Sequence, residues 1–354
     1  MLYYYILFIS SLLFAFLARI NKSKSNQYLL LILTLIFVFF AFREGFTPDY
    51  YAYESDFLSQ SISSRHNNEP LYIWMVKHVP YRLMLILQTS LICLVINLLF
   101  RKSNANYWWF CVLLLFLEKS LILGNMGALR SSFVTIFFVL AIIIRDGSKK
   151  SFVLGIILII VSSLIHKSGL IMLLPYLLCT PFAFKKNTYY FFLVISIVLI
   201  FLSLFYANTI NTWANILFED NEGFGSYKRK EISNTIKMGT FTILRLVLLF
   251  YLFFTTLKHI NIEYDILSNK CIKVTALYLL LLLMPGIGLS ARISYYLSLP
   301  VLIGSTTIID SEKGGNKMLY IFAWILLAAW DMYLFANTDN YTIIYSFYHN
   351  ILFN

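Results

Sequence analysis

Residues 28–57 read YLLLILTLIFVFFAFREGFTPDYYAYESDF, and the character of the sequence changes abruptly after Phe42. The part up to Phe42 is almost wholly apolar, which is typical of a helix that crosses a membrane. The part that follows holds tyrosines together with the charged residues Arg43, Glu44, Asp49, Glu54 and Asp56. Fixed charge and ring surface therefore meet at a membrane face, and any chemistry is expected there.

The composition places the chain in the membrane class. It is 60% hydrophobic and 13% charged, with a mean hydropathy of +0.76, whereas soluble domains have about 25% charged residues. Residues 1–20 lack the basic start and the small-residue cleavage site of a signal peptide, so they predict a first spanning helix. The cysteines lie scattered in apolar runs without C-x-x-C spacing. They are typical of small core residues and predict neither disulfides nor a metal site.

Apolar runs of suitable length predict an all-α integral membrane protein with about twelve (10–13) spanning helices. We expect one polytopic domain over residues 1–354, with longer connections at 43–81 and 208–239. Residues 151–184 leave two interpretations open, either two short spans or one span and a re-entrant piece that breaks at residues 166–169. The expected helices are 2–20, 28–42, 82–100, 107–123, 127–145, 151–165, 168–184, 188–207, 240–257, 272–289, 292–309 and 318–336.

The basic residues predict the orientation, because cytoplasmic connections are enriched in Lys and Arg. One alternating set of connections has 15 of the 28 basic residues and only five of the 17 acidic residues. These connections are 19–27, 101–106, 145–150, 185–187, 258–273 and 310–317. That face is expected to be cytoplasmic, which puts both termini and both longer connections outside. The net charge of +11 is then mainly a topology signal, and we expect no nucleic-acid partner.

Several charged residues fall at the outer ends of the expected helices, where charge is costly and usually functional. They are Arg43, Asp49, Glu69, Arg130, His166, Arg245 and Arg292. Structural alternatives stay open for each of them: a snorkelling or helix-end arginine, a cap at Asp49, a solvated charge at Glu69, or a hydrogen-bonded core histidine. Glu69 also opens EPLYIWMVKHVP, whose apolar residues predict a helix lying along the membrane face.

Two of the arginines follow glycines at expected helix starts. Arg130 follows GNMGAL, and Arg292 follows GIGLSA. Glycines allow close approach of a ligand, and a helix N-terminus with a guanidinium favours phosphate. Several arginines facing one outer cavity predict a diphosphate ligand held by Arg130 and Arg292, with help from Arg43 and Arg245.

Tyrosines beside carboxylates predict a carbohydrate. The candidate rings are Tyr50, Tyr51, Tyr53, Tyr295 and Tyr296. A lipid-diphosphate-linked saccharide contains both groups. The sequence has no D-x-D of clear metal-site character and no His/Cys cluster, so we expect no metal and no cofactor. The arginines would then hold the leaving group in place of a divalent ion.

Five motifs, in this order, resemble those of the EpsG-like, Wzy-type family of bacterial polysaccharide polymerases. They are R-x-G-x-x-x-D-Y-x-x-Y at residues 43–53, EPLY at 69–72, G-x-x-R at 127–130, IHKSGLI at 165–171 and RISYYLSLP at 292–300. The chain departs from the family at Ser131, where glutamine is common, and at residues 46–48, where a shorter, glycine-richer turn is usual.

The resemblance implies a GT-C-like membrane glycosyltransferase with its active site on the outer face of the bacterial inner membrane. It implies a donor and an acceptor that are both oligosaccharides on undecaprenyl diphosphate, and it leaves a chain-length regulator open as a further partner. We expect Asp49 to be the catalytic base, with His166 second and Glu69 third in preference. An O-antigen ligase, whose large loop would be residues 208–239, and a flippase for lipid-linked oligosaccharide are the alternatives.

Overall fold

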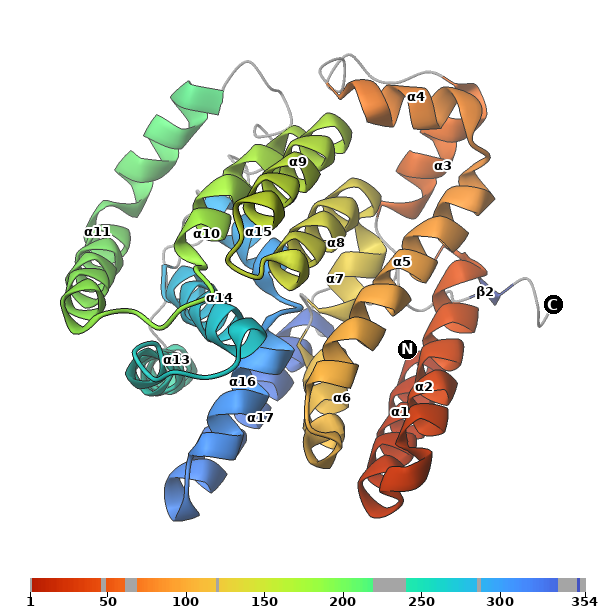
Figure 1. Cartoon of the computed structure of the whole chain (residues 1–354). Helices are drawn as coiled ribbons and strands as arrows, with labels where there is room; N and C mark the ends of the chain where they lie inside the picture. The colour runs from red at the N-terminus through yellow and green to blue at the C-terminus, as the bar shows by residue number, and fades with distance from the viewer. Residues whose placement is uncertain are drawn as a thin grey trace.

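The computed structural model describes residues 2–45, 49–60, 69–118, 121–218, 240–284, 288–336 and 349–350. Helices dominate this part of the chain, and its one sheet is a pair of two-residue strands. The predicted all-α class is therefore confirmed. The helices pack around a continuous core of apolar side chains, and all four cysteines are buried, as predicted. Figure 1 shows the arrangement.

The N-terminal helices are long and apolar. Helices α1 (Leu2–Ile20) and α2 (Ser25–Ala41) form a hairpin through the short turn η1 (Lys22–Lys24), and α2 packs on α5 (Tyr81–Lys102). Among the described residues, three segments are long and apolar enough to cross a membrane: Tyr3–Ile20, Lys22–Ala41 and Tyr81–Lys102. These three segments and several shorter apolar helices are typical of a membrane protein. The total of about twelve spans stays a prediction.

The connection 43–81 contains three ordered elements, of which the sequence predicted the last. Strand β1 (Arg43–Glu44) is followed by α3 (Tyr50–Ser59) and α4 (Pro70–His78). Proline at the first position of α4 suits a helix start, because that amide has no partner within the helix. Tyr72 and Val76 are buried on α4 while Trp74 is 53% exposed, so α4 is amphipathic, as its sequence predicted.

The single helix expected at 107–123 is wrong. The structure has η3 (Ala105–Tyr107), α6 (Trp108–Leu117), α7 (Ile122–Gly127) and α8 (Leu129–Ile144). Helix α6 ends before Glu118, whose backbone is extended. Ala128 also has an extended backbone, and it separates α7 from α8. Glycine weakens α7 at positions 124 and 127. The break places Arg130 in the first turn of α8.

The break expected at residues 166–169 is present, and the choice between two short spans and a re-entrant piece stays a prediction. Helix α9 (Lys149–Ile165) stops at His166, and the chain turns back as η4 (Lys167–Met172) and α10 (Leu173–Leu178). The turn is tight, since a Cβ on Gly169 would lie 2.6 Å from Ser162 Oγ. Glycine therefore lets η4 pack directly on the end of α9.

The C-terminal half differs from expectation in two places. Helix α11 (Lys186–Phe218) continues, with a kink at Tyr206, into the expected loop 208–239, of which 219–239 lies outside the described residues. The helix expected at 292–309 is two helices, because Pro300 has no amide hydrogen to continue the first. The remaining helices are α13 (Thr240–His259), α14 (Ile266–Leu282), α15 (Gly288–Leu297), α16 (Val301–Ser311) and α17 (Gly314–Ala336).

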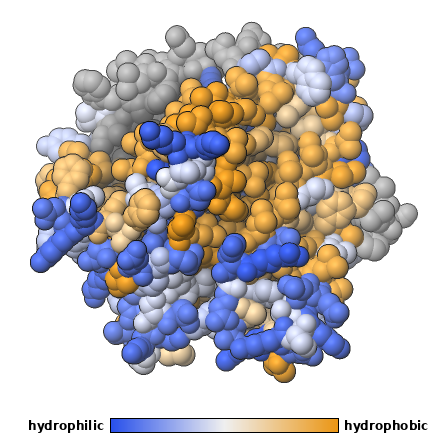
Figure 2. Space-filling model, viewed as in Figure 1, coloured by the Kyte–Doolittle hydropathy of each residue, from blue (hydrophilic) through white to orange (hydrophobic). Residues whose placement is uncertain are grey.

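The two ends of the helix bundle contain different elements. At one end, β1 pairs antiparallel with β2 (His349–Asn350), so the last strand lies beside the connection that follows α2. The α1–α2 and α16–α17 junctions lie at the lower end in Figure 1, away from α3 and α4. There the Tyr107 hydroxyl donates to Asp310 (3.1 Å) and accepts from Lys317 (2.9 Å). In Figure 2 hydrophilic residues line this lower edge, and hydrophobic residues cover the middle.

Gly304 lets α16 approach α14 closely, and replacing it tests this packing. A Cβ at Gly304 would lie 2.1 Å from Thr275 Oγ1 and 2.6 Å from the Cys271 carbonyl oxygen. We expect Gly304→Ala to lower the free energy of unfolding by about 1–3 kcal/mol, the usual cost of overpacking. Gly315→Ala is the matched control, since nothing lies within 4 Å of its Cβ. Thermal unfolding midpoints measure both; equal midpoints would contradict the close approach.

Candidate active site

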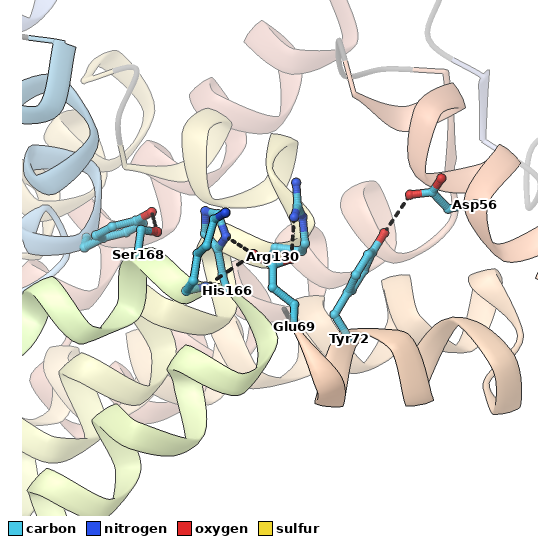
Figure 3. Close-up of polar contacts among 8 residues, drawn as sticks. Asp56, Glu69, Tyr72, Arg130, His166 and Ser168 are labelled. Carbon is cyan, nitrogen blue, oxygen red and sulfur yellow. Dashed lines mark hydrogen bonds and ion pairs between the residues drawn. The ribbon is translucent and has the colours of Figure 1, made fainter. Parts of the chain in front are cut away.

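Glu69 is the centre of a polar cluster that joins three distant parts of the chain (Figure 3). It is the N-cap residue of α4 and is 1% exposed, and its side chain makes no capping hydrogen bond to that helix. Its Oε2 accepts a hydrogen bond from Arg130 Nη1 at 2.5 Å. Its Oε1 accepts from His166 Nδ1 at 2.8 Å and from the Lys167 backbone N–H at 3.2 Å. The residues at 69, 130 and 166, which the sequence singled out separately, therefore form one unit.

The cluster fixes the charge of Glu69. Burial would raise the pKa of this carboxyl, but the hydrogen bond from His166 and the positive charge of Arg130 outweigh it and lower the pKa to about 2. The side chains of Arg130 and His166 are 15% and 12% exposed. A buried, ionised carboxylate thus stands between a guanidinium and an imidazole that both reach the surface of the site.

Tyrosines surround the guanidinium. The Arg130 Cζ lies 5.9 Å from the ring centre of Tyr53 and 5.2 Å from that of Tyr72. The Tyr72 hydroxyl donates to Asp56 Oδ2 at 3.1 Å. Burial raises the pKa of both tyrosine hydroxyls, so they are neutral at physiological pH. Arg130 is therefore held by a cation–π contact on α4 and another on α3.

Asp49 lies at the rim of the same cluster. Asp49 is exposed just before α3, and desolvation raises the pKa of its carboxyl against the opposing charge of Arg130. Asp49 is thus close enough to Arg130 for their charges to interact, while solvent and ligands can still reach it. Of the acidic candidates, it is the accessible one.

Helix α15 reaches the site through Tyr296. The Ser168 and Tyr296 hydroxyls are hydrogen-bonded at 2.7 Å, and Tyr296 is 2% exposed. Arg292 lies one turn earlier on α15, among the residues whose side chains are outside the described part of the structure. The Ser168–Tyr296 contact brings the backbone of α15 to the turn that holds His166.

The EpsG family model matches residues 26–348 of the chain. The chain belongs to the EpsG family. The resemblance predicted from the five motifs is thereby confirmed, and membership supports a polysaccharide-polymerase type of role in general. Neither the curated proteins nor the solved structures contain a match to this EpsG-family chain.

The other predicted sugar-binding rings of this EpsG-family protein occupy different surroundings. Tyr50 is buried between α3 and α5, where its carbonyl accepts from the Tyr81 hydroxyl at 3.1 Å. Tyr51 is 66% exposed. Tyr295 is partly buried against the core. Exposed Tyr51 and partly exposed Tyr53 are therefore best placed to stack on a sugar.

Two predicted diphosphate ligands lie outside the Glu69 cluster. Arg43 is 2% exposed, and its guanidinium donates to the carbonyls of Phe40 (2.5 Å) and Met126 (2.6 Å) and so ties α2 to α7. Arg245 forms a two-point ion pair with Asp331, at 3.0 and 3.2 Å, between α13 and α17. Both arginines are engaged by protein groups, which favours structural roles for them in the EpsG-family fold.

Sequence reasoning missed Tyr72 and Ser168 as parts of the site. Both lie in motifs that it had quoted, EPLY and IHKSGLI. Tyr72 is three residues after Glu69, a spacing that puts two residues on one side of a helix start. That spacing is the signal that would have found Tyr72; Ser168 is identified only by its contact with Tyr296.

Proposed function

We propose that the protein is a membrane glycosyltransferase that polymerises oligosaccharide repeat units carried on undecaprenyl diphosphate. The observation behind the proposal is the Glu69–Arg130–His166 cluster beside exposed Asp49 and tyrosine rings, in a membrane chain of the EpsG family. The basic connections support an orientation in which this cluster faces the outside of the inner membrane. The growing chain is the donor, and a newly flipped unit is the acceptor.

The reaction needs three functions at one place. A base takes the proton from an acceptor hydroxyl as its oxygen attacks the donor anomeric carbon. The bond from that carbon to the diphosphate breaks, and the diphosphate leaves with the electron pair. Arg130, helped by Arg292, stabilises that negative charge, in the role that a divalent ion has in other transferases. Tyr51 and Tyr53 stack on sugar.

The surroundings distinguish the three candidate bases. Asp49 is exposed, and desolvation raises its pKa towards a value suited to accepting a proton. His166 is partly exposed, and its Nδ1 is bonded to Glu69. Glu69 is buried with both oxygens already accepting hydrogen bonds. The proposal therefore uses Asp49 or His166 as the base.

The test is a gel of surface glycan from a strain that lacks the gene, with and without the intact chain. For a polymerase, the deletion leaves single repeat units on the final carrier, and the intact chain restores the ladder. Long glycan retained on undecaprenyl diphosphate would identify a ligase instead. Precursor confined to the cytoplasmic side would identify a flippase. Polymer formed by the purified protein from lipid-linked units would establish that bond formation needs no regulator.

A further inference from the structure

We propose that Glu69 is a positioning residue that orients His166 as the proton acceptor and holds Arg130 at the leaving group, so that one buried carboxylate connects both halves of the transfer. The inference rests on the proposed glycosyl transfer and assigns the base within it. It replaces the first sequence-based choice, Asp49, with His166, and it gives Glu69 a role other than that of a base.

The contacts of Glu69 exclude it from direct proton transfer. Its carboxylate accepts from Arg130, from His166 and from the Lys167 amide, and the residue is 1% exposed. An acceptor hydroxyl would have to displace these donors to reach it. The lowered pKa, about 2, agrees with this because so weak a base holds no proton at neutral pH.

The same contacts orient His166. An ionised carboxylate accepts a hydrogen, so Nδ1 carries the proton in the His166–Glu69 bond, and Nε2 is the nitrogen that can take another. The turn is held from two sides. Glu69 accepts from the Lys167 amide, and Tyr296 bonds to Ser168 at 2.7 Å. Gly169 lets the turn pack closely against Ser162, so the backbone that carries the His166 imidazole is held in place.

The charges that form during transfer match the charges already present. The acceptor oxygen forms its bond to the anomeric carbon while its proton passes to His166 Nε2. The imidazolium then lies beside the Glu69 carboxylate. The carbon–diphosphate bond breaks, and its electron pair goes to the diphosphate beside Arg130. Each new charge thus meets a preformed opposite charge, the arrangement that stabilises a transition state most effectively.

Arg130 is suited to a shared role. Its Nη1 bonds to Glu69, and a guanidinium has five N–H donors in a planar fork that can contact two anions at once. Two tyrosine rings fix the plane of this fork. Other titratable groups around the pair are Asp49 and Tyr53 from the α3 segment, Tyr72 from α4 and Tyr296 from α15. Among these, Asp49 is the carboxylate that could substitute as the base.

Glu69→Gln tests the proposal, with Glu44→Gln as the matched control. Glu44 lies on the same side of the bundle and pairs with Arg82 at 3.2 Å, but it is 44% exposed and lies outside the cluster. Initial rates of chain extension are measured in lipid nanodiscs with a purified lipid-diphosphate-linked oligosaccharide, from about pH 5.5 to 9, around the ordinary pKa of histidine. Thermal midpoints establish that each variant is folded.

We expect kcat of Glu69→Gln to fall by roughly 100-fold, within the range of general-base effects, and that of Glu44→Gln to stay near the wild-type value. The acidic limb of the pH–rate profile should move to lower pH in Glu69→Gln, because the carboxylate that favours the imidazolium is gone. Glu69→Asp keeps a carboxylate and should restore the position of the limb at a reduced rate. His166→Ala should lose extension at every pH.

Three results would overturn the proposal. One is a pH–rate profile of Glu69→Gln that has the same rate and the same acidic limb as the profile of Glu44→Gln. Another is a normal rate in His166→Ala together with loss in Asp49→Asn, which would make Asp49 the base. The third is a lowered Glu69→Gln rate with an unmoved limb, which would leave only a structural role.

A separate readout distinguishes failure of this inference from failure of the proposed function. If the wild-type protein extends no chain, the glycosyl transfer itself is wrong. Histidine ¹⁵N NMR still reports on the pair, with the His166 signal assigned by its loss in His166→Ala. The imidazolium should persist to higher pH in the wild type than in Glu69→Gln. Identical titrations would contradict the Glu69–His166 pairing without any assay of activity.

Discussion

Arg130→Ala is expected to slow chain extension by roughly 100- to 1,000-fold, which corresponds to the loss of one preorganised charge-stabilising donor. Two effects combine. The departing diphosphate loses the guanidinium that neutralises it, and the buried carboxylate of Glu69 loses a partner whose Nη1 lies 2.5 Å away. Rates from purified lipid-linked units, with immunoblots for protein amount, measure the change. The surface glycan should collapse from a ladder to short products.

Arg130→Lys separates charge from geometry. Lysine keeps the positive charge but lacks the planar fork that can serve a carboxylate and a phosphate together, so an intermediate rate is expected. Arg101→Ala is the matched control, because Arg101 is exposed at the far end of α5. Full extension by Arg130→Ala, at normal protein levels, would remove the site assignment altogether.

Lys270→Met is expected to lower the free energy of unfolding by about 2–5 kcal/mol, the largest stability effect among the changes proposed. Lys270 is fully buried in α14, and its ammonium donates to the carbonyls of Ile142 and Arg145 at the end of α8. The last carbonyls of a helix have no hydrogen-bond partner within the helix, and a cation at this end also interacts favourably with the helix dipole. Methionine keeps the length of the side chain but donates nothing.

Lys258→Met controls for loss of charge and for added hydrophobicity. Lys258 is exposed in the last turn of α13, so its replacement should change little. Thermal or denaturant midpoints in one detergent compare the two variants with the wild type. A Lys270→Met midpoint equal to that of Lys258→Met would show that the buried ammonium is dispensable.

The residues of the site were largely predictable, whereas their partners were not. Arg130 and His166 stand out because charge is rare in an apolar chain. The sequence does not reveal that Glu69 bonds to both, since the three lie far apart along the chain. Likewise, Arg43 shows its charge in the sequence, but not that its guanidinium meets the carbonyls of Phe40 and Met126. Partner choice depends on tertiary packing that a single sequence does not specify.

Two errors in the fold have one physical origin. Hydropathy is averaged over about 19 residues, the length of a span, and a break of one or two residues hardly changes that average. The extended residue Glu118, inside the expected helix 107–123, and the turn before Pro300 therefore escape it. The first break is followed by the short helix α7, which leads into the turn of α8 that has Arg130, and the second ends α15, which contributes Tyr296. Helix ends at a site are thus the least predictable part of this fold.

The burial of all four cysteines has a practical consequence. Cys93, Cys111, Cys179 and Cys271 are inside the protein, where a water-soluble maleimide does not reach them. A single reporter thiol can therefore be introduced without first removing the native ones. Ser59 at the end of α3 and Ser311 at the end of α16 are both exposed and differ from cysteine by one atom. Labelling of intact cells against opened cells then reads out the membrane orientation directly, on an otherwise unaltered protein.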